Sequence, residues 1–400
     1  MAERPSPPGP HKKSGKPAKP VQPVQPEQPV SDTDRPKSER SKSASLLIYL
    51  IIICSFGNLL PYIITTSVNC AVARDSIRKE AFDHLVSVRD IKKREIENFF
   101  FERRGDAYQL CTNLLFKWAI TSYIDAYGRG GTEGKEHAGI EGVRYKEVDE
   151  RYHGILSGFA DAYEYYDVLI LDPDGNVVAS ARKNPELGAN LNSEEFAKTT
   201  LKEAFEQGKR GLTVTDMKWY NIYNGPAQFV SAPILKDDTA TKDADLLGVL
   251  ILFMDGTKIN AIMTQRSGLK ESGETYLVGQ DYLMRSDSRF TVEASEVLKL
   301  KVETKPVTLA LDGKTDVIIS KDYRDTKVLS AYTFIDVAPG VRWALLAEID
   351  KAEALGMESA MITRVVWMTF AMIPIWGIIV FVFYRVMKQE LLQPQPKSPT

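Results

Sequence analysis

The chain has 400 residues, of which 44% are hydrophobic and 26% charged, and this length exceeds what one compact domain needs. Its 51 basic and 53 acidic residues nearly balance, so nucleic acid is not an expected partner. Three cysteines and four histidines supply neither a disulfide framework nor a zinc-binding spacing, so neither a metal ion nor a cofactor is expected.

The first 43 residues are rich in proline and contain almost no large apolar side chain. Ten of the 21 prolines lie there, three lie in the last seven residues, and eight are left for everything between. Such a composition cannot build a core and favours extended chain. We therefore expect residues 1–43 to be a disordered cytoplasmic tail. Arg4, Pro7 and Pro10 have the spacing of a polyproline ligand, but a solvated spacer is the preferred interpretation.

Two apolar segments without charged residues are long enough to cross a bilayer, which takes about 20 helical residues. The first covers residues 44–73, and the second covers residues 365–384 between Arg364 and Arg385. A cleaved signal peptide is the alternative for the first segment, but the 43 residues before it are too many. We expect transmembrane helices at residues 44–73 and 364–385.

Both ends of the chain carry an excess of Lys and Arg over Asp and Glu. The counts are nine against five in residues 1–43 and three against one in residues 385–400. By the positive-inside rule, both termini face the cytoplasm, and the middle of the chain lies outside the inner membrane. The final tail, residues 386–400, leaves no room for a catalytic output domain, so a separate signalling partner is expected. A receptor shortened before its output domain is the alternative.

A long helix is predicted directly after the first apolar segment. Residues 76–124 contain no Pro and one Gly, and their apolar side chains recur with a period of about 3.6 residues. We expect a stalk helix over residues 74–127, along which two copies of the chain pair into a homodimer. A Gly-rich stretch ends it, and a second helix is predicted over residues 145–162.

The pattern then changes to the alternation that is typical of strands. The turn Asp172-Pro-Asp-Gly175 separates the first two, because its residues supply a preset φ and a positive φ. A helix over residues 193–207 follows. The predicted strands cover residues 166–171, 177–181, 212–218, 228–235 and 246–253.

The same order of elements recurs about a hundred residues later. Ser231-Ala232 is matched by Ser330-Ala331, and the strand before Asp255 is matched by the strand before Asp350. The repeat of the first hairpin is expected over residues 275–286. We infer an α+β fold with two successive β-β-α-β-β-β units, each an antiparallel sheet with helices on one face.

This pattern between two spans resembles the double Cache (dCache) extracytoplasmic sensor region of bacterial transmembrane receptors. The motifs that carry the resemblance are GETYLVGQDYLMRSDSRF, DYRDTKVLSAY and RWALLAEIDKAEA, with IKKREIENFFFERRGD and YYDVLILDPDGNVV upstream. The resemblance implies two tandem PAS-like modules, membrane-distal over residues 128–265 and membrane-proximal over residues 266–354. It also implies a small-molecule ligand in the distal module, of the kind that chemotaxis transducers, histidine kinases and nucleotide cyclases sense.

Candidate ligand-binding residues cluster beside a turn between two strands of the distal module. Three aromatic side chains with a carboxylate suit a cationic or amide ligand, although the same aromatic rings could simply cover the edge of the core. Amino-acid-binding members of the family carry an Asp on the last strand, where this chain has Phe253, so an ordinary amino-acid ligand is not implied. The candidates are Asp216, Trp219, Tyr220, Tyr223 and Gln228.

Charged residues next to the strands of the proximal module have two interpretations. They either pair with one another and fasten the hairpin, or form an anion site through two arginines. These residues are Arg285, Asp287, Arg289, Asp322 and Tyr323. No nucleophile-base pair, paired-carboxylate geometry or phosphate loop is recognisable, so the chain is not expected to be an enzyme.

The sequence thus predicts a two-pass sensory receptor that binds a solute outside the inner membrane and transmits the change through its helices. A solute-capturing or scaffold protein, which recruits a soluble partner through the Pro-rich tail, is the alternative.

Overall fold

The structure is a computed structural model that describes residues 37–129, 138–236, 246–266, 268–290 and 295–392. The chain divides into two compact units, which are described separately. One comprises Thr66–Met368, and the other comprises Met1–Thr65 with Thr369–Thr400. The predicted disordered tail lies outside the described residues up to residue 36, and Lys37 already begins a helix.

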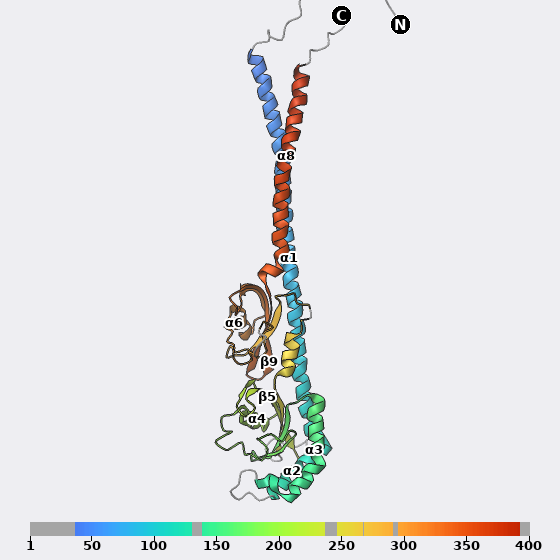
Figure 1. Ribbon diagram of the computed structural model, residues 1–400, viewed down its shortest axis with the longest axis vertical. Coiled ribbons are helices and arrows are strands. Elements are labelled where there is room, and N and C mark those ends of the chain that lie inside the picture. The colour runs from blue at the N-terminus through green and yellow to red at the C-terminus, as the bar shows by residue number, and fades with distance from the viewer. Residues whose placement is uncertain (1–36, 130–137, 237–245, 267, 291–294, 393–400) are drawn as a thin grey trace, which may run out of the picture. The chain divides into compact units, whose positions relative to one another are not determined.

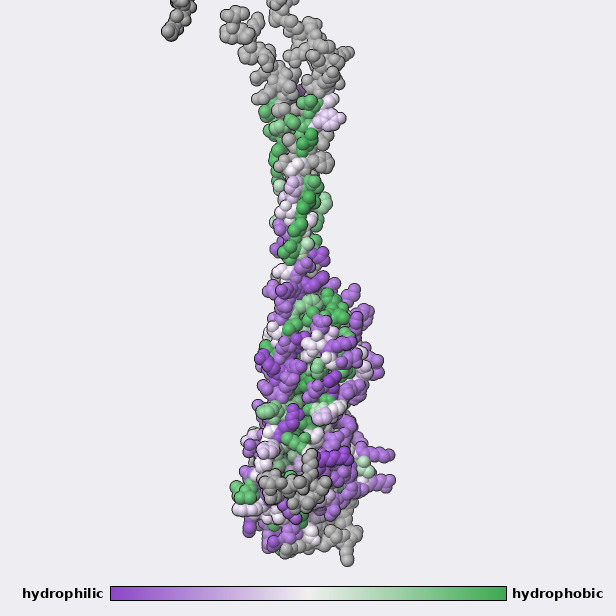
Figure 2. Space-filling view, turned by 180° about the vertical axis from the view of Figure 1, so that it is seen from behind, coloured by the Kyte–Doolittle hydropathy of each residue, from purple (hydrophilic) through white to green (hydrophobic). Residues whose placement is uncertain are grey.

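The helical unit contains the beginning of α1 (Lys37–Thr112) and the end of α8 (Gly356–Leu392). Within α8, the 27 residues Ala360–Val386 are long and apolar enough to cross a membrane, and they are the one such stretch found among the described residues. Their side chains are mainly hydrophobic and exposed (Figure 2). Residues 44–73 lie inside α1, and their role as a second span stays a prediction.

The stalk is two helices rather than the single helix predicted over residues 74–127. α1 ends at Thr112, and α2 covers Leu114–Arg129. The break lies at Asn113, whose side-chain oxygen accepts hydrogen bonds from the backbone N–H groups of Leu115 (2.9 Å) and Phe116 (3.2 Å). Asparagine is a strong N-cap residue because its side chain satisfies amides that lack a partner in the first turn. A short 3-10 helix (Ala138–Glu141) and α3 (Val143–Tyr163) follow.

The first sheet has six antiparallel strands in the order β2-β1-β6-β5-β3, with β4 paired to β5 off this path. Its strands are β1 (Asp167–Leu171), β2 (Val177–Ser180), β3 (Thr213–Val214), β4 (Lys218–Tyr220), β5 (Gly225–Leu235) and β6 (Leu246–Met254). The predicted turn is present, with Gly175 at φ 87°. The helix predicted over residues 193–207 is shorter: α4 covers Thr200–Gly208, capped by the Thr199 side chain. α5 (Thr257–Thr264) leads out of the sheet.

The second sheet has four antiparallel strands in the order β7-β10-β9-β8. They are β7 (Glu274–Val278), β8 (Asp316–Lys321), β9 (Lys327–Ala338) and β10 (Val341–Asp350), with α6 (Lys305–Leu311) before β8 and α7 (Lys351–Ala354) after β10. The repeat is therefore incomplete. The segment predicted to return as a second hairpin strand makes only the isolated bridges Val278↔Met284 and Leu283↔Lys301.

Helix α1 is the element that both sheets share (Figure 1). Its residues Leu85 and Val88 join a buried cluster with Leu329 and Ile349 of the second sheet. Further along, α1, α2 and α3 join the large core that also contains Trp343 of β10 and one face of the first sheet. The opposite face of the first sheet packs against α4 in a separate cluster. The candidate site lies in this cluster between the first sheet and α4.

Candidate ligand-binding site

Five aromatic rings gather on the face of the first sheet that α4 covers. We call them the aromatic cluster: Tyr166, Tyr220, Tyr223, Phe229 and Phe253. Phe253 of β6 is central, with its ring centroid 4.6 Å from that of Tyr166, 4.9 Å from Phe229 and 5.2 Å from Tyr223. The contacts are edge-to-face and tilted, and the face of an aromatic ring attracts a cation.

A buried carboxylate stands against these rings. Glu186, in the turn after β2, is 3% exposed, and its Oε1 accepts a hydrogen bond of 2.9 Å from the hydroxyl of Tyr220. Within the part of the chain that the structure describes, its buried Oε2 has no hydrogen-bond partner. Burial raises the pKa of Glu186, because the charged form loses its hydration. An acceptor left unpaired in this way costs about 1–3 kcal/mol unless a ligand satisfies it.

A second buried acid, Asp167 of β1, holds the turn that carries Glu186. Its carboxylate accepts hydrogen bonds from the side chains of Ser180 (2.7 Å) and Asn184 (3.0 Å) and from the backbone N–H of Arg182 (3.1 Å). Despite these donors, burial raises the pKa of Asp167 to about 6. Asp167 therefore positions residues 180–184, directly before Glu186.

Replacing Asp167 with asparagine should remove a pH dependence of stability. A carboxyl with a pKa of about 6 in the folded chain and about 3.9 unfolded binds more protons when folded, so its contribution falls as pH rises from 4 to above 6. In urea denaturation of the full chain in detergent, the free energy of unfolding of the variant should rise by up to about 3 kcal/mol relative to that of the wild type as the pH increases from 4 to above 6. The wild type and the variant both retain the neighbouring charged residues Glu186 and Arg182, so these residues contribute equally to the two pH profiles. A constant difference between the two chains would contradict the assignment.

The structure brings together only part of the residue set predicted from the sequence. Tyr220 and Tyr223 belong to the aromatic cluster. Trp219 is exposed on β4, and Lys299 Nζ lies over its ring, 5.8 Å from the centroid. Gln228 precedes Phe229 on β5 and therefore points to the opposite face, where its Nε2 donates to the carbonyl of Thr215 (2.9 Å).

Asp216 lies between the two sheets and not beside the aromatic cluster. Its carboxylate accepts hydrogen bonds from Arg285 Nε (3.1 Å) and Nη2 (2.8 Å), and from the indole N–H of Trp343 (2.8 Å). The prediction that Asp216 contacts the ligand finds no support in this geometry, because residues of the second sheet module occupy its oxygens. A local pattern of charge and rings could not reveal partners 69 and 127 residues away.

The charged residues predicted in the second module have separate partners. Arg285 also pairs with Asp281 (2.9 Å) in its own turn, so two carboxylates, those of Asp216 and Asp281, hold its guanidinium. The other contacts are Asp287 with Asn260 and Ser295, Arg289 with the carbonyls of Lys270 and Gly273, Asp322 with Arg324, and Tyr323 with Glu274 and Ser288. These contacts join the predicted residues to other parts of the chain, and the choice between the two interpretations stays a prediction. Glu186 is not among the residues predicted from the sequence, because a single glutamate in a turn gives no sign that it is buried.

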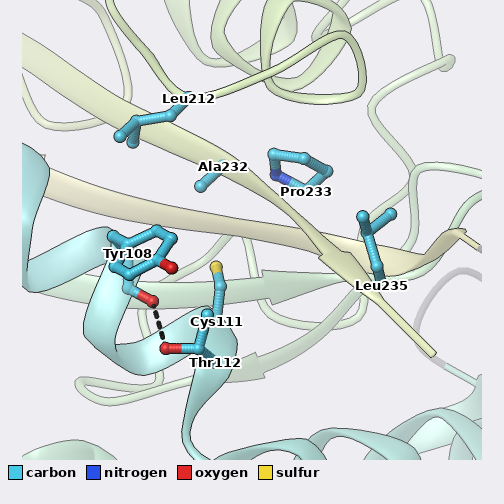
Figure 3. A pocket seen from close by; sticks show the side chains of 7 residues that line it. All are labelled: Tyr108, Cys111, Thr112, Leu212, Ala232, Pro233 and Leu235. Atoms are coloured by element: carbon cyan, nitrogen blue, oxygen red, sulfur yellow. Dashed lines mark hydrogen bonds between the residues drawn. The ribbon is translucent and has the colours of Figure 1, made fainter. Parts of the chain in front are cut away.

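Two cavities lie elsewhere in the same unit. One, of about 230 Å³, opens between the end of α1 and β5, where Tyr108, Cys111 and Thr112 face Ala232 and Pro233 (Figure 3). The described residues that line it include no charged side chain. The other, of about 610 Å³, lies where α1 meets the end of α3 and α5, and its lining includes Glu95, Glu102, Arg103, Glu164 and Lys258. Neither is lined by the aromatic cluster or by Glu186.

No protein-family model matches the chain, and no curated protein matches it. Solved ligand-binding domains of chemoreceptors are similar to it. That of Pseudomonas fluorescens CtaA in complex with L-leucine is 11% identical, with a TM-score of 0.43 over 70% of this chain and 99% of that one. That of Campylobacter jejuni Tlp3 in complex with 4-methylisoleucine is 12% identical, with a TM-score of 0.46 over 70% and 94%. That of Pseudomonas aeruginosa PAO1 PctC in complex with GABA is 14% identical, with a TM-score of 0.42 over 67% and 99%.

Proposed function

We propose that the chain is a sensory receptor of the inner membrane that binds a small cationic solute in its first sheet module, residues 128–265. The observation that carries this proposal is the buried Glu186 carboxylate, with one oxygen unpaired, against the aromatic cluster. A carboxylate combined with ring faces is the chemistry that recognises an amine or a quaternary ammonium group.

The edge of the aromatic cluster supports a positively charged ligand. Tyr166 and Tyr223 are half-buried there, so solvent reaches this side of the rings. Burial and then nearby carboxylates raise the pKa of both tyrosines, and Asp255 contributes to each. Negative charge therefore flanks the rings at Asp255 as well as at Glu186. An anionic solute would be repelled at such a site, whereas a cation would be attracted.

The receptor is proposed to be a two-pass membrane protein with both termini in the cytoplasm. Spans over residues 44–73 and 364–385 place the two sheets outside, with the first sheet module distal and the second, residues 266–354, proximal. A solute that prefers one arrangement of the first sheet shifts the population of that arrangement. α1 is continuous from Lys37 to Thr112 and contacts both sheets, so it is suited to carry the shift toward the membrane and a signalling partner.

A stripe of exposed apolar side chains on the stalk supports a homodimer. Phe101 and Tyr108 of α1 are exposed and lie seven residues apart on the same helix. This is the spacing at which one helix packs along a second one. A second copy of the chain, with the same stripe, is the proposed occupant.

Binding of amines to the full chain in detergent tests the proposed function. We expect choline, putrescine or ethanolamine to raise the melting temperature, whereas glycerol and succinate should not. At a ligand concentration of 100 Kd the stabilisation should be about 2.7 kcal/mol. Glu186→Gln should abolish the shift, because it removes the charge and keeps the shape.

The matched control is Glu194→Gln, an exposed carboxylate of the same module that should leave the shift unchanged. A stabilisation by succinate but by none of the amines would overturn the proposal. So would a Glu186→Gln variant that responds as the wild type does.

A further inference from the structure

Three buried carboxylates meet in the second sheet module, outside the aromatic cluster. They belong to Glu274 of β7, Glu348 of β10 and Asp322, which follows β8. One oxygen of each lies within 4.8 Å of the others, and all three residues are buried. Glu274 and Glu348 stand directly opposite each other in the β7–β10 pair, where two like charges repel.

The charges around this carboxylate cluster do not balance. Arg324 pairs with Asp322 (2.6 Å) and also with Asp350 (2.8 Å). The other hydrogen bonds to the two glutamates that the structure records come from neutral hydroxyls, those of Tyr276, Tyr323 and Ser288. One guanidinium thus faces three carboxylates of the cluster.

Two oxygen atoms at the carboxylate cluster have no hydrogen-bond partner among the described residues. They are Oε1 of Glu348, a residue that is 1% exposed, and Oγ of the fully buried Ser330. Ser330 of β9 stands opposite Glu348, and Glu348 stands opposite Glu274, so the three form one row across three strands. The Ser330 hydroxyl is the neutral neighbour of Glu348 across the β9–β10 pair, and a neutral hydroxyl alone compensates a buried anion poorly, since the desolvation of an anion is costly. The row therefore points to a positively charged ligand.

We propose that Glu274, Asp322 and Glu348 bind one divalent cation, and that Ca²⁺ is the ion that fits best. Oxygens that each lie about 2.3–2.6 Å from a common Ca²⁺ can be at most about 5 Å apart, which agrees with their separation of 4.8 Å or less. The donors are hard oxygens only, which disfavours soft metals. Mg²⁺ usually keeps several waters, for which a site between buried side chains leaves little room.

The ion would join three parts of the second module. Glu274 and Glu348 lie on adjacent strands, and Asp322 begins the turn between β8 and β9. β10 continues from Glu348 to Asp350, which is bonded to Arg324 and directly precedes α7 and α8. Bound Ca²⁺ therefore stiffens the end of the module from which the chain enters α8. This role is independent of the amine site.

Calcium binding by the wild-type chain is the primary test, since it needs no variant. The full chain in detergent is treated with EDTA to remove bound metal and is then dialysed. CaCl₂ or MgCl₂ is added at pH 7.5, binding is measured by calorimetry, and the melting temperature is recorded with and without each salt. We expect one Ca²⁺ per chain and a rise in melting temperature of several degrees, with a smaller rise for Mg²⁺. If protons alone neutralise the cluster, melting will not respond to Ca²⁺, and this result overturns the proposal.

Two variants locate the ion. Glu348→Gln retains an acceptor for Tyr276 and should weaken Ca²⁺ binding at least tenfold. Glu303→Gln, in an exposed pair with Lys301, should leave it unchanged. Calcium binding that is equal in wild type and Glu348→Gln would place the ion elsewhere and overturn the assignment. If Glu348→Gln does not fold, Glu274→Gln replaces it under the same criterion.

Discussion

Replacing Asp216 with alanine is expected to lower the free energy of unfolding by about 3–5 kcal/mol, the cost of breaking a buried ion pair by removing one partner. The residue accepts two hydrogen bonds from the Arg285 guanidinium, which is 1% exposed, and one from the buried indole of Trp343. Without the carboxylate, both donors stay buried and lose this acceptor. The loss should be measured by urea denaturation of the full chain in detergent, followed by tryptophan fluorescence.

The control for Asp216 is Asp281, the other carboxylate paired with Arg285. Its side chain is 48% exposed, so solvent screens the pair and Asp281→Ala should cost no more than about 1 kcal/mol. Because Asp216 belongs to the first module and Arg285 to the second, the variant should also loosen the coupling between the two modules. An effect of Asp216→Ala as small as that of Asp281→Ala would show that the contact contributes little to stability.

Truncating Phe100 to alanine is expected to cost about 3–5 kcal/mol, as is typical of a buried phenylalanine. Phe100 lies on α1, is 1% exposed, and makes an edge-to-face contact with Trp343 at a centroid distance of 5.5 Å. The ring therefore attaches the stalk helix to the second sheet. Alanine would leave a cavity, and α1 cannot move to fill it because the helix is packed against both sheets. The same urea denaturation measures the effect.

The neighbouring residue Phe101 is a matched control on the same helix. It is 75% exposed, so Phe101→Ala should change the stability of one chain by less than about 0.5 kcal/mol. If the exposed stripe pairs two copies, Phe101→Ala should instead weaken the dimer, which light scattering of the detergent complex detects. Equal losses of stability in the two variants would contradict the packing of α1 described above.

These contacts change the interpretation of the charged residues near the strands. Asp216 and Arg285 were candidates for ligand contact and for an anion site, yet they bond each other across the two modules. The acid that we propose to face the ligand in the first module is instead Glu186, which lies in the turn after β2 and accepts a hydrogen bond from Tyr220. A binding event at Glu186 and a rearrangement at Asp216 can be separated experimentally, since no hydrogen bond joins the two among the described contacts.

The elements themselves were largely predictable from local patterns. Alternation over residues 166–171 and 246–253 predicted strands that are observed as β1 and β6, and the helix predicted over residues 145–162 is observed as α3 (Val143–Tyr163). The apolar segment before Arg385 lies within the observed stretch Ala360–Val386. These features depend on the periodicity of side chains along one element, which is present in the sequence. The break at Asn113 is local too, but asparagine within a helical pattern does not reveal whether it caps.

The sequence by itself determined the α+β class, most of the order of the elements and the division into two antiparallel sheets, because each follows from short-range patterns of apolar residues. Only the tertiary structure decided which acids are buried together. Glu274, Asp322 and Glu348 are spread over 75 residues of sequence, yet strand register places two of them face to face and a turn brings in the third. Register and turn geometry arise from contacts between distant segments, and no local pattern of residues contains them.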